Sequence, residues 1–115
     1  MTELRVVRAS EQPFTEVRGD GAEGLELARI YRHPDRAATF QIARIAPGGI
    51  SKRHAHAWDQ ANWIASGEAE VDVDGQTLHL GPGDSVIIPG GTPHSFENRG
   101  QGPLTLLAVL GPGAP

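Results

Sequence analysis

Two histidines separated by one residue are the strongest chemical signal in this sequence. His54 and His56 stand two positions apart, and alternate residues of a β-strand point to the same face, about 6.6 Å apart along the strand. Two imidazoles placed in this way can tilt toward one cation. Because imidazole nitrogen is a good ligand for several divalent metals, the pair predicts a metal site.

Gln60 and His94 are the candidates for completing this site. On a straight strand Gln60 would lie about 13 Å beyond the histidine pair, so its participation requires the chain to reverse near residues 57–59. His94 follows a Gly/Pro-rich turn and comes from a third segment, and spacing alone leaves its role open. His33 and His79 stand alone and are expected to be surface or hydrogen-bonded residues.

The composition restricts the ligands and the partners of the protein. The chain contains no cysteine, which excludes disulfides, thiolate ligands and cysteine nucleophiles. Ten basic and fourteen acidic residues give a net charge of −4, without the clustered basic face that nucleic-acid binding needs. The charged N-terminal residues do not resemble a secretory signal, and no apolar run approaches the roughly 20 residues of a membrane span. We therefore expect a cytoplasmic protein with neither a nucleic-acid nor a membrane partner.

Short alternating strands must position the candidate ligands. Apolar and polar residues alternate through most of the chain, and no stretch has the period of an amphipathic helix. Asp74-Gly75 between two alternating runs is typical of a β-hairpin, whereas Pro47-Gly48-Gly49 is expected to break the chain. Many short strands with regular turns are typical of an all-β sandwich or barrel. The predicted strands cover residues 25–31, 39–45, 60–66, the two arms of a hairpin in 68–80, a buried strand at 85–88, 94–98 and 104–110.

A chain of 115 residues fits one domain spanning residues 1–115. Its core is expected in about residues 37–110, with residues 1–24 as an N-terminal extension and residues 111–115 as a loose tail. The two alternating strands between residues 25 and 45 would offer a sheet edge to a second chain, and an unprotected edge otherwise invites aggregation. We therefore expect a homodimer.

Two stretches resemble the two sequence motifs of the cupin superfamily. The first is Gly48-x5-His54-x-His56-x3-Gln60-x6-Gly67, and the second is Gly83-x5-Pro89-x-Gly91-x2-His94-x3-Asn98. Residues 68–82 separate them, a short spacer like that of small microbial cupins. The resemblance implies a single-domain cupin with a double-stranded β-helix, or jelly-roll barrel. It also implies one divalent metal ion per chain, held by His54, His56, Gln60 and His94.

Gln60 is where this sequence departs from the family, which usually has Glu at that position. A carboxamide oxygen can bind a divalent ion but brings no charge. The ion would then be a stronger Lewis acid and favour anionic bidentate substrates such as enolates, catecholates or 2-oxo acids. The alternative is a three-histidine site in which Gln60 contacts bound water or substrate. Asp59, one residue off the pattern, is expected to face away from the metal. A local bulge would instead turn Asp59 toward the metal and Gln60 away from it.

Strand alternation places further residues near the site. Asn62 shares a face with Gln60, and Asn98 shares one with His94. An amide on an inward face needs a partner, so Asn62 is either a hydrogen-bonded core amide or a contact to substrate or water, while Asn98 is expected to secure a turn. The remaining candidates for filling the barrel, lining its wall or forming dimer contacts are Trp58, Trp63, Ile64 and Phe96.

No nucleophile triad and no general acid or base stands out in the motif region, so the metal and its bound water would supply the reactivity. The resemblance implies a dioxygenase or other oxidoreductase acting on a small oxygenated or enolisable compound. Fe2+ is the favoured metal, with Mn2+, Ni2+ or Zn2+ as alternatives. A non-redox isomerase, cyclase, lyase or decarboxylase, and a non-catalytic small-molecule or metal-binding module, stay open because the fold hosts all of them.

Overall fold

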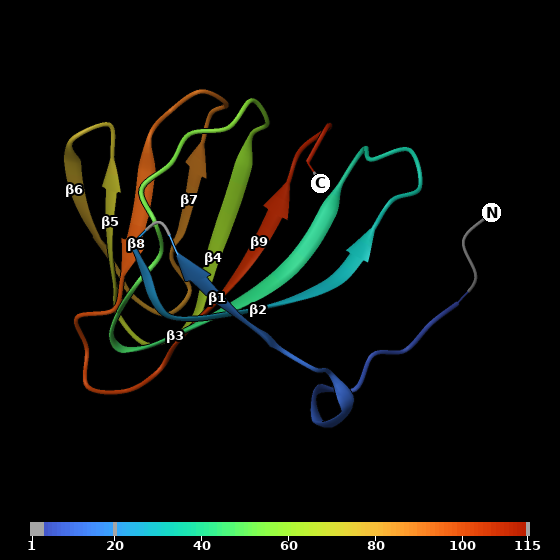
Figure 1. Cartoon of the computed structure of the whole chain (residues 1–115), viewed down its shortest axis with the longest axis horizontal. Helices are drawn as coiled ribbons and strands as arrows, with labels where there is room; N and C mark the ends of the chain where they lie inside the picture. The colour runs from blue at the N-terminus through green and yellow to red at the C-terminus, as the bar shows by residue number, and fades with distance from the viewer. Residues whose placement is uncertain (1–3, 20, 115) are drawn as a thin grey trace.

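The described residues form an almost entirely β-stranded barrel (Figure 1). This computed structural model describes residues 4–19 and 21–114. The predicted all-β class and jelly-roll architecture are confirmed. Within the described residues a 3-10 turn, η1 (Ala9–Glu11), precedes the strands β1 (Thr15–Gly19), β2 (Ala22–Arg32), β3 (Thr39–Ile50), β4 (Gln60–Ser66), β5 (Ala69–Val73), β6 (Gln76–Leu80), β7 (Ser85–Ile88), β8 (His94–Glu97) and β9 (Leu104–Leu110).

The strands form two walls that share a corner. Strands β1-β2-β3-β9-β4-β7 pair in that order along one wall, and β6-β5-β8 form the other. The walls meet where Ile50, the last residue of β3, pairs with Glu97 of β8. Just beyond this corner His54 pairs with His94 in an isolated bridge. The chain therefore brings the two histidine-bearing segments together where the walls join (Figure 1).

The apolar core follows from the alternation along the strands. In β9, Leu104, Leu106, Ala108 and Leu110 are buried, whereas Val109 between them is 42% exposed. Each fully buried aliphatic side chain contributes about 1.5–3 kcal/mol relative to its exposed state. The inward side chains therefore fix the register of the strands, since a slip of one residue would turn them all toward solvent.

The hairpin predicted at Asp74-Gly75 is confirmed. Strands β5 and β6 pair without a register shift up to Val73 opposite Gln76. Both turn residues have positive φ angles, 50° at Asp74 and 84° at Gly75. This is the requirement of a two-residue type I′ turn, whose twist matches that of the flanking strands.

Two expectations for individual strands were wrong. The chain does not break at Pro47-Gly48-Gly49, because β3 continues to Ile50. The backbone pairs with Asn98 on both sides, through Gly48 N–H to Asn98 O at 2.9 Å and Asn98 N–H to Gly49 O at 3.0 Å. Strand β7 was expected to be buried, but Ile87 is 67% exposed. It lies at the end of its wall, where one face meets solvent.

Residues near both ends of the chain pair with or pack against the barrel, which the sequence did not indicate. Residues 15–19 of the expected N-terminal extension form β1 and pair with β2. In the expected loose tail, the N–H of Gly113 donates to Arg36 O at 3.0 Å, and Ala114 is fully buried. Pro115 lies outside the described residues.

The strands predicted as dimer edges are largely covered. Strand β3 lies between β2 and β9, and the first half of β2 pairs with β1. The part of the chain that the structure describes holds no apolar helix long enough to span a membrane.

Candidate metal centre

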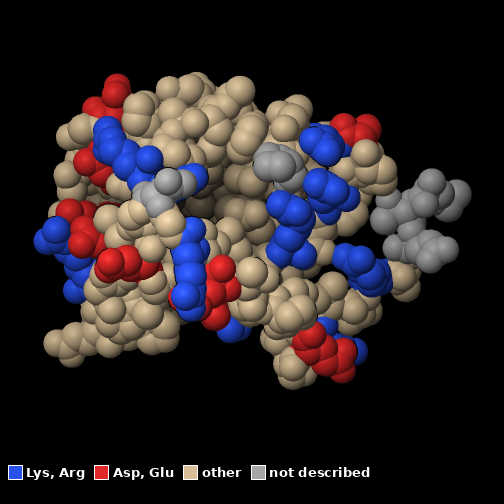
Figure 2. Space-filling model, in the orientation of Figure 1, with Lys and Arg blue, Asp and Glu red and all other residues tan. Residues whose placement is uncertain are grey.

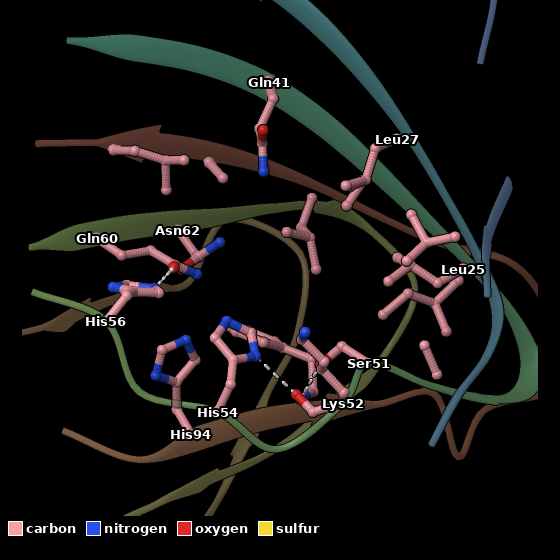
Figure 3. A pocket seen from close by; sticks show the side chains of 18 of the residues that line it. Leu25, Leu27, Gln41, Ser51, Lys52, His54, His56, Gln60, Asn62 and His94 are labelled. Carbon is pink, nitrogen blue, oxygen red and sulfur yellow. Dashed lines mark hydrogen bonds between the residues drawn. The ribbon is translucent and has the colours of Figure 1, made fainter. Parts of the chain in front are cut away.

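The three histidines of the predicted site converge inside the barrel. His54, His56 and His94 each offer one ligand nitrogen, and these nitrogens lie within 4.8 Å of one another. The ring centroids are 4.7 Å apart for His54 and His94, 4.9 Å for His56 and His94 and 5.3 Å for His54 and His56. Figure 3 shows the three rings directed toward one region of the cavity.

Backbone pairing sets this convergence. The N–H of His54 donates to His94 O at 3.1 Å, and the N–H of His94 donates back to His54 O at 2.9 Å. The two residues therefore stand directly opposite each other, on segments that are distant in sequence. His56 follows two positions later, and its carbonyl accepts from Gly91 N–H at 2.6 Å. The turn of the second motif, at Gly91, therefore holds the loop of the first motif, at His56, in place.

Gly90 lets the turn before His94 lie close to the loop that follows His56, because it has no side chain. A Cβ at this position would lie 2.3 Å from the carbonyl oxygen of Ala57, a distance that no side chain permits. The N–H of Gly90 also donates to Asp59 Oδ1 at 2.8 Å. Asp59 therefore faces the turn, as expected, and not the histidine cluster.

Each imidazole is held by one nitrogen so that the other is available. The Nδ1 atoms of His54, His56 and His94 lie 2.9 Å from the backbone carbonyls of Lys52, Trp58 and Thr92, respectively. A carbonyl oxygen only accepts, so each Nδ1 carries the proton in the neutral ring. The three Nε2 atoms then present lone pairs, the arrangement that metal-binding histidines use.

His94 is the most buried of the three, with 2% of its surface exposed. Its Nε2 is buried without a hydrogen-bond partner. Burial lowers the pKa of His94, with small further contributions from His54, His56 and Arg53, while the hydrogen bond to Thr92 O opposes the shift. Burial therefore favours the neutral ring, which is the form that binds a metal.

Gln60 adds an oxygen to this group. The chain reverses at residues 57–59 as predicted, and β4 begins at Gln60. Gln60 Oε1 lies 2.9 Å from His56 Nε2, and Gln60 Nε2 donates to Asn62 Oδ1 at 2.8 Å. Because the proton of His56 is on Nδ1, two acceptor atoms face each other at 2.9 Å. A cation between them would turn this repulsion into shared coordination, so the residues fit a divalent ion.

The neighbouring residues divide between structural and cavity-lining roles. Asn62 is 2% exposed, and its Nδ2 is buried without a partner. Asn98 secures a turn as expected, since its Nδ2 donates to the carbonyls of Ile45 and Gly102. The indole of Trp58 stacks on His56, with ring centroids 4.5 Å apart and planes 5° from parallel. Trp63 is 45% exposed.

A cavity of about 290 Å³ opens beside the histidines and Gln60. Its wall is mostly apolar, and the charged residues that line it are Arg29 and Lys52. Figure 2 shows this face of the molecule hollowed, with Lys and Arg side chains on both sides of the hollow. The sequence reasoning missed Arg29, Gln41 and Lys52, because their approach to the site depends on strand pairing that the sequence does not display. The apolar lining includes Val17, Leu25, Leu27, Ala43, Ile45, Trp58, Phe96, Leu106, Ala108 and Leu110.

Comparisons with known proteins agree with this architecture. The model of a family described as "Cupin domain" matches residues 41–110. Acireductone dioxygenase of Rhodopseudomonas palustris is 39% identical over 72 residues, covering 59% of this chain and 41% of that protein. Mannose-1-phosphate guanylyltransferase of Escherichia coli is 35% identical over 119 residues, covering 95% of this chain and 25% of that protein. The chain thus spans less than half of the length of either relative.

Solved structures resemble the fold over nearly the whole chain. A predicted oxalate decarboxylase from Thermotoga maritima has a TM-score of 0.87 at 27% identity, with 94% of this chain and 99% of that chain covered. The polyketide cyclase RemF from Streptomyces resistomycificus has a TM-score of 0.84 at 24% identity, with 95% and 80% covered. At that identity the likeness to RemF is one of fold alone.

Proposed function

This chain belongs to the cupin family, and from that premise we propose that it is a metal-dependent oxidoreductase of the dioxygenase type. It holds one divalent ion through His54, His56, His94 and Gln60, and acts on a small oxygenated or enolisable compound. The observation that carries the proposal is the convergence of acceptor atoms. Three Nε2 lone pairs and one amide oxygen meet at a cavity, with every Nδ1 proton committed to a backbone carbonyl.

Fe2+ is the metal that this ligand set and reaction type favour. Three neutral imidazoles and a neutral amide would leave the ion its full positive charge, and a bound Fe2+ would supply Lewis acidity together with one-electron chemistry toward dioxygen. An oxygen-bearing anion that offers two donor atoms would be attracted most strongly to such an ion. The substrate is therefore a small anionic chelator.

The protein residues bind and orient this substrate. The backbone carbonyls of Lys52, Trp58 and Thr92 fix the three imidazole rings. The mostly apolar wall lowers the local polarity, which strengthens the electrostatic interactions inside the cavity. Asn62 has an amide N–H group without a partner beside Gln60, and this group would donate to an oxygen of the substrate.

Two relatives support two related chemistries. The similarity to acireductone dioxygenase supports oxygenation. The similarity to a predicted oxalate decarboxylase, which covers almost all of both chains, supports a non-redox lyase reaction as the second candidate. Both reactions would use the same ion and an anionic, oxygen-rich substrate.

Dioxygen uptake separates these candidates. The Fe2+-loaded protein is incubated with a panel of enediols, catechols and 2-oxo acids while dioxygen and substrate are both measured. We expect dioxygen consumption in step with substrate loss for at least one compound class, and none in a His54→Ala variant. Substrate loss without dioxygen uptake would show that the protein is a lyase or isomerase and not an oxygenase. Full metal occupancy without conversion of any compound would favour a binding module.

A further inference from the structure

One row of cross-strand neighbours leads away from the metal-binding residues along the cavity wall. Asn62 of β4 pairs with Ala108 of β9, Ala108 pairs with Gln41 of β3, and Gln41 pairs with Arg29 of β2. Residues opposite one another on neighbouring strands point to the same face. All four line the cavity, and Figure 3 shows Gln41 extending into it from β3.

The next row along the same strands is apolar. It consists of Leu27, Ala43, Leu106 and Ile64, in the same strand order from β2 to β4. The polar row beside it runs from buried Asn62 to exposed Arg29. Asn62 needs a partner, because a buried polar group without one costs free energy. Ala108 is the small member of the polar row, and its methyl group leaves room above the sheet between the two amides.

The donors of the polar row are not used within the protein. Asn62 Nδ2 is buried without a hydrogen-bond partner. Among the residues that the structure describes, neither the Gln41 amide nor the Arg29 guanidinium forms a hydrogen bond or an ion pair with another residue. Native proteins satisfy most of their buried polar groups. Asn62 is buried, whereas Gln41 is half-buried and Arg29 is exposed at the other end of the row. One buried donor without a partner, in line with two further unused donors on the cavity wall, points to a ligand that lies along them.

We propose that the row Asn62-Gln41-Arg29 binds the length of the substrate, and that Arg29 pairs with a carboxylate at its far end. The inference rests on the proposed function, because the near end of the substrate is the chelating end at the metal. Asn62 and Arg29 are three strand spacings apart, roughly 14 Å between their Cα atoms at about 4.8 Å per spacing. Because the sheet curves into a barrel, inward side chains converge, so the two end groups are closer together than their Cα atoms.

The charge around the cavity agrees with this assignment. The chain as a whole carries a net charge of −4, yet the charged residues lining the cavity are Arg29 and Lys52. A basic cavity in an acidic protein focuses anions. The planar guanidinium also matches a carboxylate with two parallel hydrogen bonds. The substrate class is therefore an acid with two neighbouring oxygen donors at one end and a carboxylate at the other.

A matched pair of probes tests this inference. 2-Oxoglutarate and 2-oxopentanoate have the same chain length and the same chelating 2-oxo acid end, and only the former has a distal carboxylate. Binding of each is measured by calorimetry to the Fe2+-loaded protein without dioxygen, so that no turnover occurs. We expect 2-oxoglutarate to bind about tenfold more tightly, as is typical of a hydrogen bond between charged groups.

Variants assign the preference to Arg29. Arg29→Gln should abolish the difference between the probes, because 2-oxoglutarate then loses the partner of its distal carboxylate. Arg32→Gln, on the same strand but outside the cavity lining, should preserve the difference. Equal binding of the probes to the parent protein, or a preference that survives Arg29→Gln, would overturn the inference. Binding of neither probe would overturn it as well. Metal analysis of the same samples tells these outcomes apart from failure of the metal site itself.

Discussion

His54 and His94 face each other across a single antiparallel bridge, joined by two backbone hydrogen bonds of 3.1 and 2.9 Å. Their imidazole centroids are 4.7 Å apart. The backbone bonds fix the two residues opposite each other, and the Nδ1 contacts with Lys52 O and Thr92 O orient the two rings.

Removing any one of the three imidazoles should largely abolish metal binding. His54→Ala, His56→Ala and His94→Ala each delete a ligand whose other nitrogen is already held by a carbonyl. In the parent, added Fe2+ or Ni2+ should raise the melting temperature, because an ion that binds only the folded state stabilises it. Metal content and melting temperature are the measurements, with His79→Ala as the control that retains both. Full occupancy in two of the three variants would mean that the site lies elsewhere.

Gln60→Glu should raise the affinity for divalent ions and weaken anion binding. A carboxylate about 4 Å from the ion contributes roughly 4 kcal/mol per unit charge of the ion at an effective dielectric constant near 20, or about 8 kcal/mol for a divalent ion, before compensation. The pKa of metal-bound water should also rise, since the charge of the ion is partly neutralised. Gln60→Ala should lose affinity only modestly, because three imidazoles remain. A metal titration of the Glu variant that matches the parent would remove Gln60 from the ligands.

Gly90→Ala should destabilise the protein and loosen the site. The new methyl group would lie 2.3 Å from Ala57 O, so the turn that precedes His94 must move away from the loop that follows His56. We expect a loss of about 1–3 kcal/mol in the free energy of unfolding, as for other overpacked positions. Gly102→Ala is the matched control, since its Cβ would meet nothing within 4 Å. Equal melting temperatures for the two variants would refute the close-approach argument.

Acid should destabilise the metal-free protein over a defined pH range. Burial lowers the pKa of His94 below its ordinary value of 6.5, so the unfolded chain binds this proton more tightly than the folded one. The stability is therefore complete above pH 6.5 and is lost as the pH falls from there through the lowered pKa. Asp72 acts in a separate, more acidic range, because its pKa is lowered from 3.8 chiefly by its hydrogen bond to Arg53. Urea midpoints between pH 7.5 and 5 that do not fall would contradict the burial effect.

Self-association should use the outer face of the wall formed by β1, β2, β3, β9, β4 and β7. The edge strands predicted from the sequence should not be involved. Ile87, Ala61 and Val109 are cross-strand neighbours on that face, and Ile87, Trp63 and Val109 are 67%, 45% and 42% exposed. Contiguous exposed apolar residues are typical of protein interfaces. We expect a dimer in sedimentation, converted to monomer by Ile87→Lys. Thr77→Lys, on the exposed side of β6, is the control, and a monomeric parent at micromolar concentration would refute the expectation.

The sequence was sufficient to predict the barrel and the grouping of the site residues. Alternation and the Asp74-Gly75 turn are local signals, and the spacing of His54, His56 and Gln60 could be interpreted once a chain reversal was assumed. The site's inward amide, Asn62, was also predictable, because strand alternation relates it directly to Gln60.

The remaining features depend on pairing between distant strands. Arg29 and Gln41 reach the cavity only because β2, β3, β9 and β4 align in one register. Nothing near either residue in the sequence indicates that alignment. The continuation of β3 past Pro47 was missed for the same reason, since Asn98, which pairs with it, lies far along the chain. Ala114 is likewise buried in a cluster with Ala108 and Leu110, against which the distant residue Trp58 packs.

X-ray absorption at the metal edge of the Fe2+-loaded, tag-free protein tests the metal centre most directly. It reports the number and type of atoms around the ion, and imidazole rings give a characteristic multiple-scattering pattern. We expect one ion per chain, surrounded by nitrogen and oxygen with three imidazoles, and little bound metal in His94→Ala. An ion with one imidazole or none, or full metal occupancy with an unchanged spectrum in His94→Ala, would contradict the three-histidine site.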